Sequence, residues 1–131
     1  MTPFELRQRI AAFAREVAAF TKPLLKSIET QDAARQLRRS SSSVAANHRA
    51  AGTGQSHGDF TAKLAIAATE ADESLYWLKY LRDSGAAPTR GLAPLLQEAK
   101  ELSAILAASF ATAKAREEAA KQEKQRRHRR F

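Results

Sequence analysis

The sequence predicts an all-α fold, an antiparallel up-down-up-down four-helix bundle, and three observations support this prediction. Apolar residues recur every three or four positions along four segments, which is the spacing of helices packed against one another. The 131 residues include only 5 Gly and 4 Pro, and β-branched residues are sparse, so helix is favoured over strand throughout. Short connections between the four segments favour neighbours that run antiparallel.

The first predicted helix opens at Pro3 and ends near Thr21. Thr2 and Glu5 have the spacing of a capping box, in which each side chain satisfies a backbone amide at the start of the helix. Pro23 ends or bends the helix, because proline restricts the residue before it. The apolar seam that faces the other helices consists of Leu6, Ile10, Phe13, Val17, Phe20 and Leu24.

The second predicted helix covers about residues 32–51, and Gly52 and Gly54 stop it. The run Ser40–Ser43 looks like a linker, yet each serine costs a helix only a few tenths of a kcal/mol relative to alanine. Small side chains let helix backbones approach closely, so this segment favours a tightly packed bundle. Its inward seam is Ala34, Leu37, Ser41, Val44, His48 and Ala51.

The third predicted helix starts after Ser56, a candidate N-cap, and ends at Gly85. Its seam is Phe60, Leu64, Ala67, Ala71, Leu75 and Leu78, continuing to Leu81 or Arg82. The fourth predicted helix begins between Thr89 and Pro94, because proline is tolerated in a first turn. Its stripe is Leu92, Leu95, Ala99, Leu102, Leu106 and Phe110, and no stop signal separates it from the charged tail.

The positive charge of the chain is concentrated at its C-terminal end. Residues 114–131 hold eight Lys or Arg and three Glu, a net charge of +5, out of +8 for the whole chain. Residues 1–113 are therefore only mildly basic. We divide the chain into a four-helix bundle over residues 1–115 and a basic C-terminal extension of the last helix over residues 116–131, frayed or disordered.

Several protein classes are disfavoured by composition. The chain has no cysteine, which removes disulfides, thiolate metal sites and cysteine nucleophiles and is typical of a reducing cytoplasm. The N-terminus does not have the pattern of a signal peptide. No stretch approaches the roughly 20 apolar residues that span a bilayer. We therefore expect a cytoplasmic location and no membrane partner.

The second and third predicted helices carry an ordered set of family-like motifs. Residues 36–40 (QLRRS) and 43–47 (SVAAN) resemble an LRRA-x-x-S-V/I-x-A-N motif. Further matches are Asp59-Phe60, Lys63-Leu64, Ile66-Ala67, Glu70, Glu73 and Tyr76-Trp77-Leu78. In these motifs the chain is similar to the bacterial four-helix-bundle proteins also called ribosomal-RNA intervening-sequence proteins. The resemblance covers roughly residues 5–115.

This resemblance implies an antiparallel four-helix bundle that assembles, in known members, as a ring-like homopentamer. The family takes its name from open reading frames inside insertions in large-subunit ribosomal RNA genes. A related branch serves as the accessory protein of reverse transcriptases in diversity-generating retroelements, where it binds RNA and the polymerase through basic surfaces. The resemblance therefore implies RNA and a reverse-transcriptase-type protein as partners.

Two groups of basic residues are candidates for nucleic-acid binding. Arg35 and Arg38 lie within one turn of the second helix, and Arg49 lies on the face of Arg38. Arginines on an exposed face contact phosphates without reading sequence. The tail adds Lys124, Arg126, Arg127, Arg129 and Arg130. The alternatives are ion pairing for the helix arginines and a solubilising role for the tail, whereas the absence of an apolar face disfavours a membrane-surface role.

A polar network between the second and third helices is also predicted. If these helices turn back near residue 54, position 39 lies opposite about position 71, which brings Glu70 and Glu73 within reach of Arg39. Such an ion-pair network fixes helix register more than it adds stability. We expect Asn47 to bond across the bundle core, because a buried amide has to be satisfied.

An aromatic cluster on the third helix is the candidate oligomer interface. Tyr76, Trp77 and Tyr80 lie within five residues, and the adjacent Tyr76 and Trp77 cannot both face one core. Aromatic residues are enriched at subunit interfaces. The alternative is that Trp77 merely covers the edge of the bundle.

No catalytic residue, metal site or cofactor is predicted. Di-iron bundles need Glu-x-x-His pairs, and no glutamate here has histidine three residues later. The three histidines lack metal-ligand spacing, and the chain has no phosphate-binding glycine loop or nucleophile elbow. We therefore expect a non-enzymatic oligomeric bundle that binds RNA, DNA or a nucleoprotein partner. The alternative is a structural or protein-interaction scaffold with no nucleic-acid binding.

Overall fold

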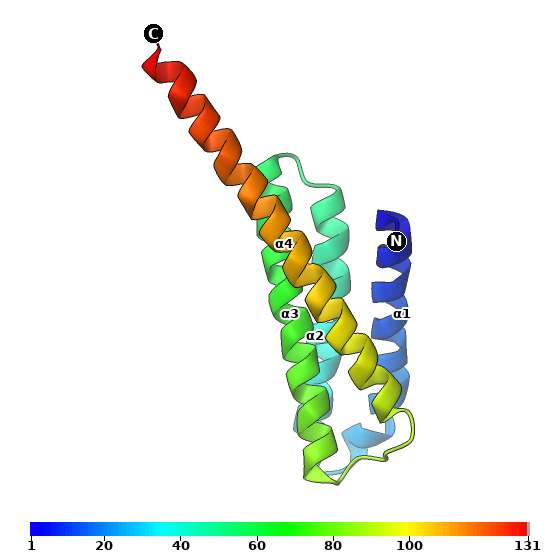
Figure 1. Ribbon diagram of the computed structural model, residues 1–131. Coiled ribbons are helices and arrows are strands. Elements are labelled where there is room, and N and C mark those ends of the chain that lie inside the picture. Colours follow the sequence, from blue (N-terminus) through cyan, green and yellow to red (C-terminus); the bar gives the residue numbers. More distant parts are fainter. Residues whose placement is uncertain (131) are drawn as a thin grey trace.

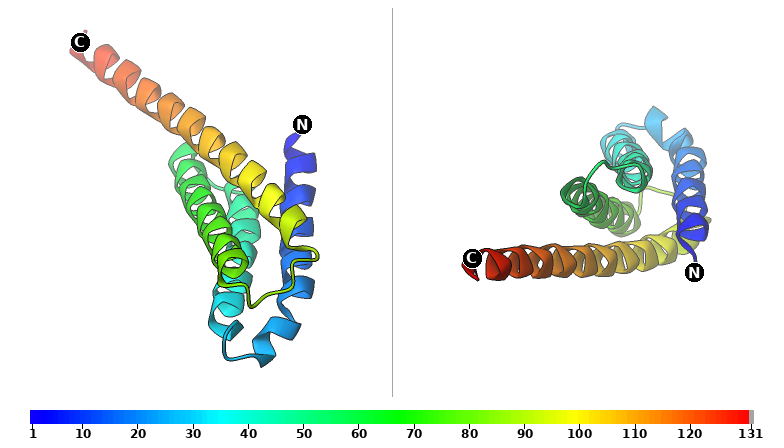
Figure 2. Two further views of the ribbon diagram at one scale, coloured as in Figure 1. Left: turned by 60° about the horizontal axis from the view of Figure 1, so that its bottom comes forward. Right: turned by 90° about the horizontal axis from the view of Figure 1, so that it is seen from above.

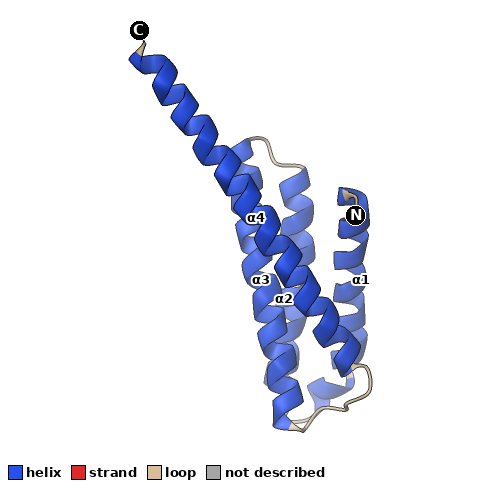
Figure 3. Ribbon diagram, in the orientation of Figure 1, coloured by secondary structure: helices blue, strands red, loops and turns tan. Residues whose placement is uncertain are grey.

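The computed structural model describes residues 1–130 and contains four α-helices and one short 3₁₀ helix (Figure 1). They are α1 (Pro3–Thr21), η1 (Pro23–Lys26), α2 (Gln31–Gly52), α3 (His57–Ser84) and α4 (Leu92–Arg129). No strand occurs among these residues (Figure 3). The predicted fold class, an all-α antiparallel four-helix bundle, is confirmed. The last position of the predicted extension, Phe131, lies outside the described residues.

The four helices alternate in direction, and α4 lies obliquely across the others (Figures 1 and 2). Its first turns lie beside the C-terminal end of α1, while its last turns project beyond the end of the bundle at which α2 ends and α3 begins. The pair α2 and α3 has the most extensive contact of any two helices. The connection that leads into α4 reaches Gly91 in the left-handed region, at φ 84°.

Local signals place the helix ends where the sequence predicts them. The capping box of α1 is confirmed, because the Thr2 hydroxyl accepts from the Glu5 amide at 3.1 Å and the Glu5 carboxylate accepts from the Thr2 amide at 3.0 Å. The hydroxyl of Ser56 caps α3 by accepting from the Asp59 amide at 3.1 Å. Gly85 follows α3 with φ 70°, a conformation that glycine adopts without steric cost.

The core is a set of leucines and other aliphatic residues joined by buried small polar residues. The largest fully buried apolar side chains are Ile10, Val17, Leu37, Val44, Leu78, Leu81, Leu102 and Leu106. Between α2 and α3, the hydroxyls of Ser40 and Ser74 lie 2.8 Å apart and share a hydrogen bond, and both residues are fully buried. The serine run is therefore part of a helix–helix contact, where its small side chains allow close packing.

Candidate nucleic-acid interface

The basic C-terminal part of α4 leaves the bundle as an extended helix. Ala113, which packs with Ala51, Leu64 and Phe110, is the last buried position of α4. We call residues 114–130 the overhang; at 1.5 Å per residue it spans about 25 Å. Its last turns project beyond every other helix (Figure 1). The overhang is helical to Arg129, and fraying of this segment in solution stays a prediction.

The first part of the overhang, residues 114–123, is the stem. It holds three basic and three acidic residues and has no net charge. Lys114 pairs with Glu118 and Lys121 with Glu117, each at 3.3 Å and four residues apart. Pairs at this spacing stabilise a helix by about 0.2–0.5 kcal/mol each. They support the stem, in which Glu117 also contacts Thr61 of α3.

The second part of the overhang, residues 124–130, is the tip. It has no acidic residue and carries all five basic tail residues predicted to bind nucleic acid: Lys124, Arg126, Arg127, Arg129 and Arg130. All five side chains are exposed. Arg126 and Arg127 both contact Glu123 at the end of the stem, at 2.6 and 3.3 Å. The tip is therefore the strongest concentration of positive charge among the described residues.

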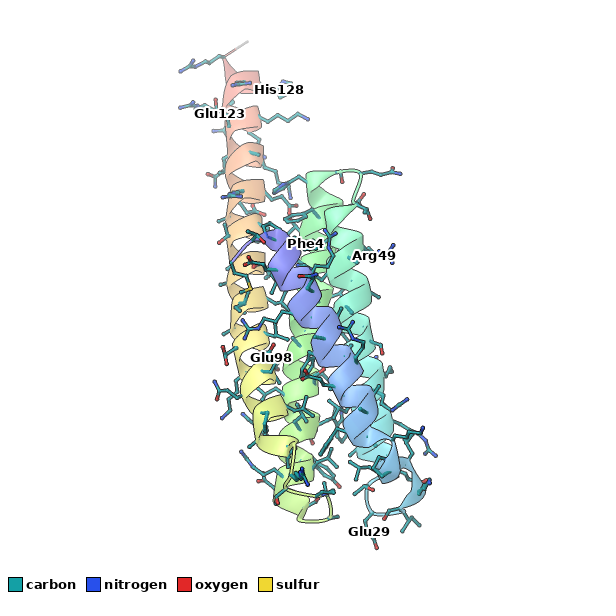
Figure 4. The ribbon with its side chains drawn as sticks, turned by 90° about the vertical axis from the view of Figure 1, so that its right-hand side faces the viewer. Phe4, Glu29, Arg49, Glu98, Glu123 and His128 are labelled. Carbon is teal, nitrogen blue, oxygen red and sulfur yellow. The ribbon has the colours of Figure 1, made fainter. Side chains whose placement is uncertain are left out.

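The three predicted arginines of α2 have different surroundings. Arg35 is exposed and contacts Asp32 and Gln31 in its own first turn, each at 3.3 Å. Arg49 is exposed, points outward from α2 (Figure 4) and has no ion-pair partner within residues 1–130. These two side chains are available at the surface.

Arg38 is partly buried, and one guanidinium nitrogen is engaged with α1. Its Nη1 donates to the Ala18 carbonyl at 2.7 Å and to the Thr21 hydroxyl at 3.0 Å. The last carbonyls of a helix lack partners within the helix and carry partial negative charge. Arg38 therefore fastens α2 to the end of α1. The structure does not assemble Arg35, Arg38 and Arg49 into one exposed stripe.

Arg39 joins α2 to α3 through the two predicted glutamates. Its Nη2 lies 2.8 Å from Glu73 Oε1 and its Nη1 lies 3.6 Å from Glu70 Oε2. The hydrogen bond that Arg39 donates to Glu73 is the main cause that raises the pKa of Arg39. The prediction for Asn47 is wrong, because its amide donates to the Ser43 carbonyl and hydroxyl on its own helix, at 2.9 and 3.1 Å. At a partly buried position, this local bond satisfies the amide without a partner across the core.

A second ion-pair network, between α1 and α4, was not predicted from the sequence. The Nε of Arg9 donates to Glu98 at 2.8 Å and its Nη2 donates to Glu101 at 3.0 Å. Glu98 lies between the two helices (Figure 4). The hydrogen bonding that Arg9 donates to Glu98 is the largest cause that raises the pKa of Arg9. The two glutamates are three residues apart, so the sequence alone places them on one face of α4. It does not identify Arg9 as their partner, because that depends on the register between the first and fourth helices.

The predicted interface aromatics form a partly exposed cluster on α3. Trp77 is half-buried against the core, whereas Tyr76 and Tyr80 are 58% and 47% exposed. Both tyrosines make edge-to-face contacts with Trp77, with ring centroids 4.9 and 5.6 Å apart. The indole nitrogen of Trp77 is buried with no acceptor among residues 1–130. This cluster presents rigid aromatic surface to solvent, and its role as an interface stays a prediction.

A cavity of about 380 Å³ lies at the end of the bundle where α1 and α4 diverge. Its apolar wall includes Leu6, Phe60 and Ile105, and Arg7 and His48 also line it. Phe60 was predicted to face the core, but it is 37% exposed and lines this cavity. Nδ1 of His48 is buried with no hydrogen bond in the described chain. Burial, with a smaller contribution from the charge of Arg7, lowers the pKa of His48.

Residues 1–130 contain no group of three or more His, Asp or Glu arranged to hold a metal ion. Among the same residues, no helix has the length and apolar character needed to cross a bilayer. The remaining surface features that could engage a ligand are the basic tip, the exposed α2 arginines, the aromatic cluster and the cavity beside His48.

The fold and these surfaces define a small helical bundle with a basic helical extension. The model of the family described as 23S rRNA-intervening sequence protein matches residues 3–108. The chain belongs to this family, which confirms the resemblance stated from the motifs. The matched region ends before the overhang.

A solved structure shows the same fold. It is a protein of unknown function from the S23 ribosomal protein family of Bacteroides thetaiotaomicron, and it is 27% identical to this chain. The alignment covers 85% of this chain and 99% of the other, with a TM-score of 0.76. A comparison with curated protein sequences gives no match.

Proposed function

We propose that this protein is a non-enzymatic, self-associating helical bundle of the cytoplasm that binds nucleic acid, RNA in particular, through its overhang. The observation that carries the proposal is the tip, where five exposed cations occur in seven residues without an acidic residue. Arg49 and Arg35 on α2 supply secondary contacts. The link of the family name to 23S rRNA agrees with an RNA partner.

The proposed binding mechanism is charge neutralisation without sequence readout. Each phosphate that a Lys or Arg neutralises releases counterions, so the logarithm of the affinity falls with the logarithm of salt by about 0.7–0.9 per phosphate. Self-association would present several tips to one nucleic acid and raise the affinity through effective concentration. Tyr76, Trp77 and Tyr80 are the proposed interface, and the pentamer of known family members is the proposed assembly.

A scaffold that binds only proteins is the second candidate function. It is favoured by the observation that Arg9, Arg38 and Arg39 all hold helices together, so their guanidinium groups are already engaged within the bundle. In that case the tip keeps the assembly soluble. A reverse-transcriptase-type protein is the partner class that the family resemblance proposes.

Fluorescence anisotropy with a structured RNA, over salt concentrations of about 50–300 mM, tests the proposal. The test variant replaces Lys124, Arg126, Arg127, Arg129 and Arg130 with Gln, which removes the charge of the tip and retains good helix formers. We expect this variant to bind at least about 30-fold more weakly with a flatter salt slope, whereas the control Arg49→Ala loses at most about threefold. An unchanged affinity for the five-Gln variant would exclude the tip, and no binding by the natural chain at the lowest salt would favour the scaffold.

Light scattering on the same samples tests self-association independently. The variant Tyr76→Ser/Tyr80→Ser removes exposed aromatic surface without touching the buried side of Trp77. We expect its mass to fall toward that of the 14.4 kDa monomer, while the five-Gln variant keeps the mass of the natural chain. An unaltered mass for the tyrosine variant would exclude this interface.

A further inference from the structure

The overhang consists of two parts with opposite electrostatic character. The stem has no net charge, and its Lys114 and Lys121 pair with Glu118 and Glu117, whereas the tip carries five basic residues and no acidic one. Glu123 at the end of the stem pairs with Arg126 and Arg127 of the tip. A neutral stem is not itself drawn toward phosphates. It holds the tip away from the bundle, because the tip begins 11 residues after Ala113, about 16 Å along the helix axis.

The cations of the tip lie on opposite sides of the helix axis. Successive residues of an α-helix are rotated by about 100°, so Lys124 and Arg126 point about 160° apart, and so do Arg127 and Arg129. The remaining face, about 140° wide, holds Gln125 and His128. A helix that lies on a flat phosphate surface or along one strand uses a single face, and its opposite cations then point to solvent. A contact on one side of the tip would therefore leave the cations of the other side unused.

The side chains between these cations exclude a lipid surface as the target. Apart from charged residues and His128, the overhang contains only alanine and glutamine. A helix that binds in the headgroup region of a membrane needs a face of large apolar side chains. The tip is therefore suited to a site that places negative charge on more than one of its sides and has no hydrocarbon region.

We infer that the tip inserts as a helix into the major groove of a duplex, between its two phosphate walls. The major groove of B-form DNA is about 12 Å wide and admits an α-helix, which has an overall diameter of about 10–12 Å. The major groove of regular A-form RNA is too narrow for side chains to read, so an RNA ligand needs a bulge that opens the groove. The ligand class is a duplex with a wide major groove.

The helix dipole does not oppose this placement strongly. The C-terminal end of a helix carries about half a negative charge, and the tip at that end carries five full positive charges. The inference rests on the proposed function, since it names the nucleic-acid structure that the same tip would bind. It concerns a segment beyond residue 108, where the family match ends.

Anisotropy with the full chain and four probes of about 20 nucleotides or base pairs, at about 100 mM salt, tests this inference. The probes are B-form DNA duplex, regular RNA duplex, the same RNA duplex with a three-nucleotide bulge, and single-stranded RNA. We expect the DNA duplex, the bulged RNA or both to bind at least about tenfold more tightly than the other two. The difference in affinity between the DNA duplex and the bulged RNA then shows which of these two nucleic acids is the preferred ligand.

The variant Gln122→Pro separates a helical tip from a merely charged one. Proline breaks the helix just before the tip without changing its charge, while the control Gln122→Ala retains the helix. Gln122 is exposed, and circular dichroism of both variants reports that the bundle is intact. We expect the proline variant to lose the preference for wide-groove duplexes and to bind all four probes within about threefold.

The possible failures are distinct. If the natural chain binds all four probes within about twofold, or if Gln122→Pro keeps the preference of Gln122→Ala, the groove inference is wrong while nucleic-acid binding stands. If the natural chain binds no probe at about 50 mM salt, both the inference and the proposed function are wrong.

Discussion

The two halves of α4 form one continuous helix for different physical reasons. Residues 92–113 bury a leucine stripe against the other helices, including Leu92, Leu95, Leu102 and Leu106. Residues 114–130 include no buried residue, and they are supported by local ion pairs and by one contact with another helix, between Glu117 and Thr61 of α3. The first half is therefore held by tertiary structure and the second by its own sequence.

This difference separates folding from surface chemistry. Helical stability in proteins comes mostly from packing an apolar face, so the bundle half of α4 unfolds with the whole domain. Local pairs between exposed charges are weak and are screened by salt. Substitutions in the overhang should therefore change its helicity without changing the midpoint of global unfolding. Paired substitutions, one in each half of α4, test this.

The largest expected effect comes from a cavity in the bundle half of α4. Leu106 is 0% exposed, and replacing a buried leucine with alanine costs about 2–5 kcal/mol. We expect Leu106→Ala to lower the free energy of unfolding by that amount in urea denaturation. In the overhang, Ala119→Gly should reduce the far-ultraviolet helical signal by weakening local propensity, yet leave the midpoint in place. A clear shift of the midpoint by Ala119→Gly would mean that the overhang is packed against something in solution.

Sequence patterns were sufficient for the leucine stripes and the helix ends, because both are local. The capping box at Thr2 and the cap at Ser56 each depend on residues three positions apart. The tip is also readable, since it is a run of like charges. The exposure of Phe60 was not predictable from its spacing, because Phe60 lines a cavity together with residues of α1, α2 and α4, and local spacing does not report how four helices meet.

Polar contacts between helices are predictable from the sequence only where the register of the two helices is known. Arg39 and its glutamates lie on consecutive antiparallel helices, whose register follows from the turn between them. Arg9 and Glu98 lie on the first and last helices, and nothing local fixes their register. Arg38 has the spacing of a surface arginine, but it donates to the Ala18 carbonyl and the Thr21 hydroxyl at the end of α1, a contact that depends on the position of another helix.

A second comparison is between a buried and an exposed serine of α2, at its contact with α3. Ser40 is fully buried against Ser74, whereas Ser42 is exposed two residues later. Ser40→Val removes a hydrogen bond and adds volume where the two helices approach closely, so we expect a loss of about 1–3 kcal/mol in unfolding free energy. Ser42→Val should stay within about 0.5 kcal/mol of the natural chain. Equal effects of the two valines in thermal and urea unfolding would contradict the role given to the serine run.

Arg9 and Arg35 compare an ion pair between helices with one inside a helix. Arg9 is about a quarter exposed and contacts two glutamates of α4, while Arg35 is 60% exposed and contacts its own first turn. We expect Arg9→Met to cost about 1–2 kcal/mol, because hydrogen bonds to charged groups exceed neutral ones, and Arg35→Met to cost less than about 0.5 kcal/mol. Urea titrations of both variants measure these losses. Matching losses would mean that solvent screens the Arg9 network as fully as the exposed pair.

The smallest expected effect is a pH dependence that distinguishes a histidine of the bundle from one of the overhang. Burial and the nearby Arg7 lower the pKa of His48 below its ordinary value near 6.5, so between those two pKa values the unfolded chain binds more protons than the folded one. Stability should therefore fall as the pH drops below about 7 and stop falling once the pH is below the folded-state pKa. His48→Gln should flatten this part of the profile in urea unfolding at pH 7.5, 6.5 and 5.5. The control His128→Gln changes the tip, which has no buried residue, and should leave the unfolding midpoint in place. If both variants keep the natural slope, His48 takes up its proton as readily in the folded chain as in the unfolded one, and the wall beside Arg7 must be open enough for water to solvate the charge.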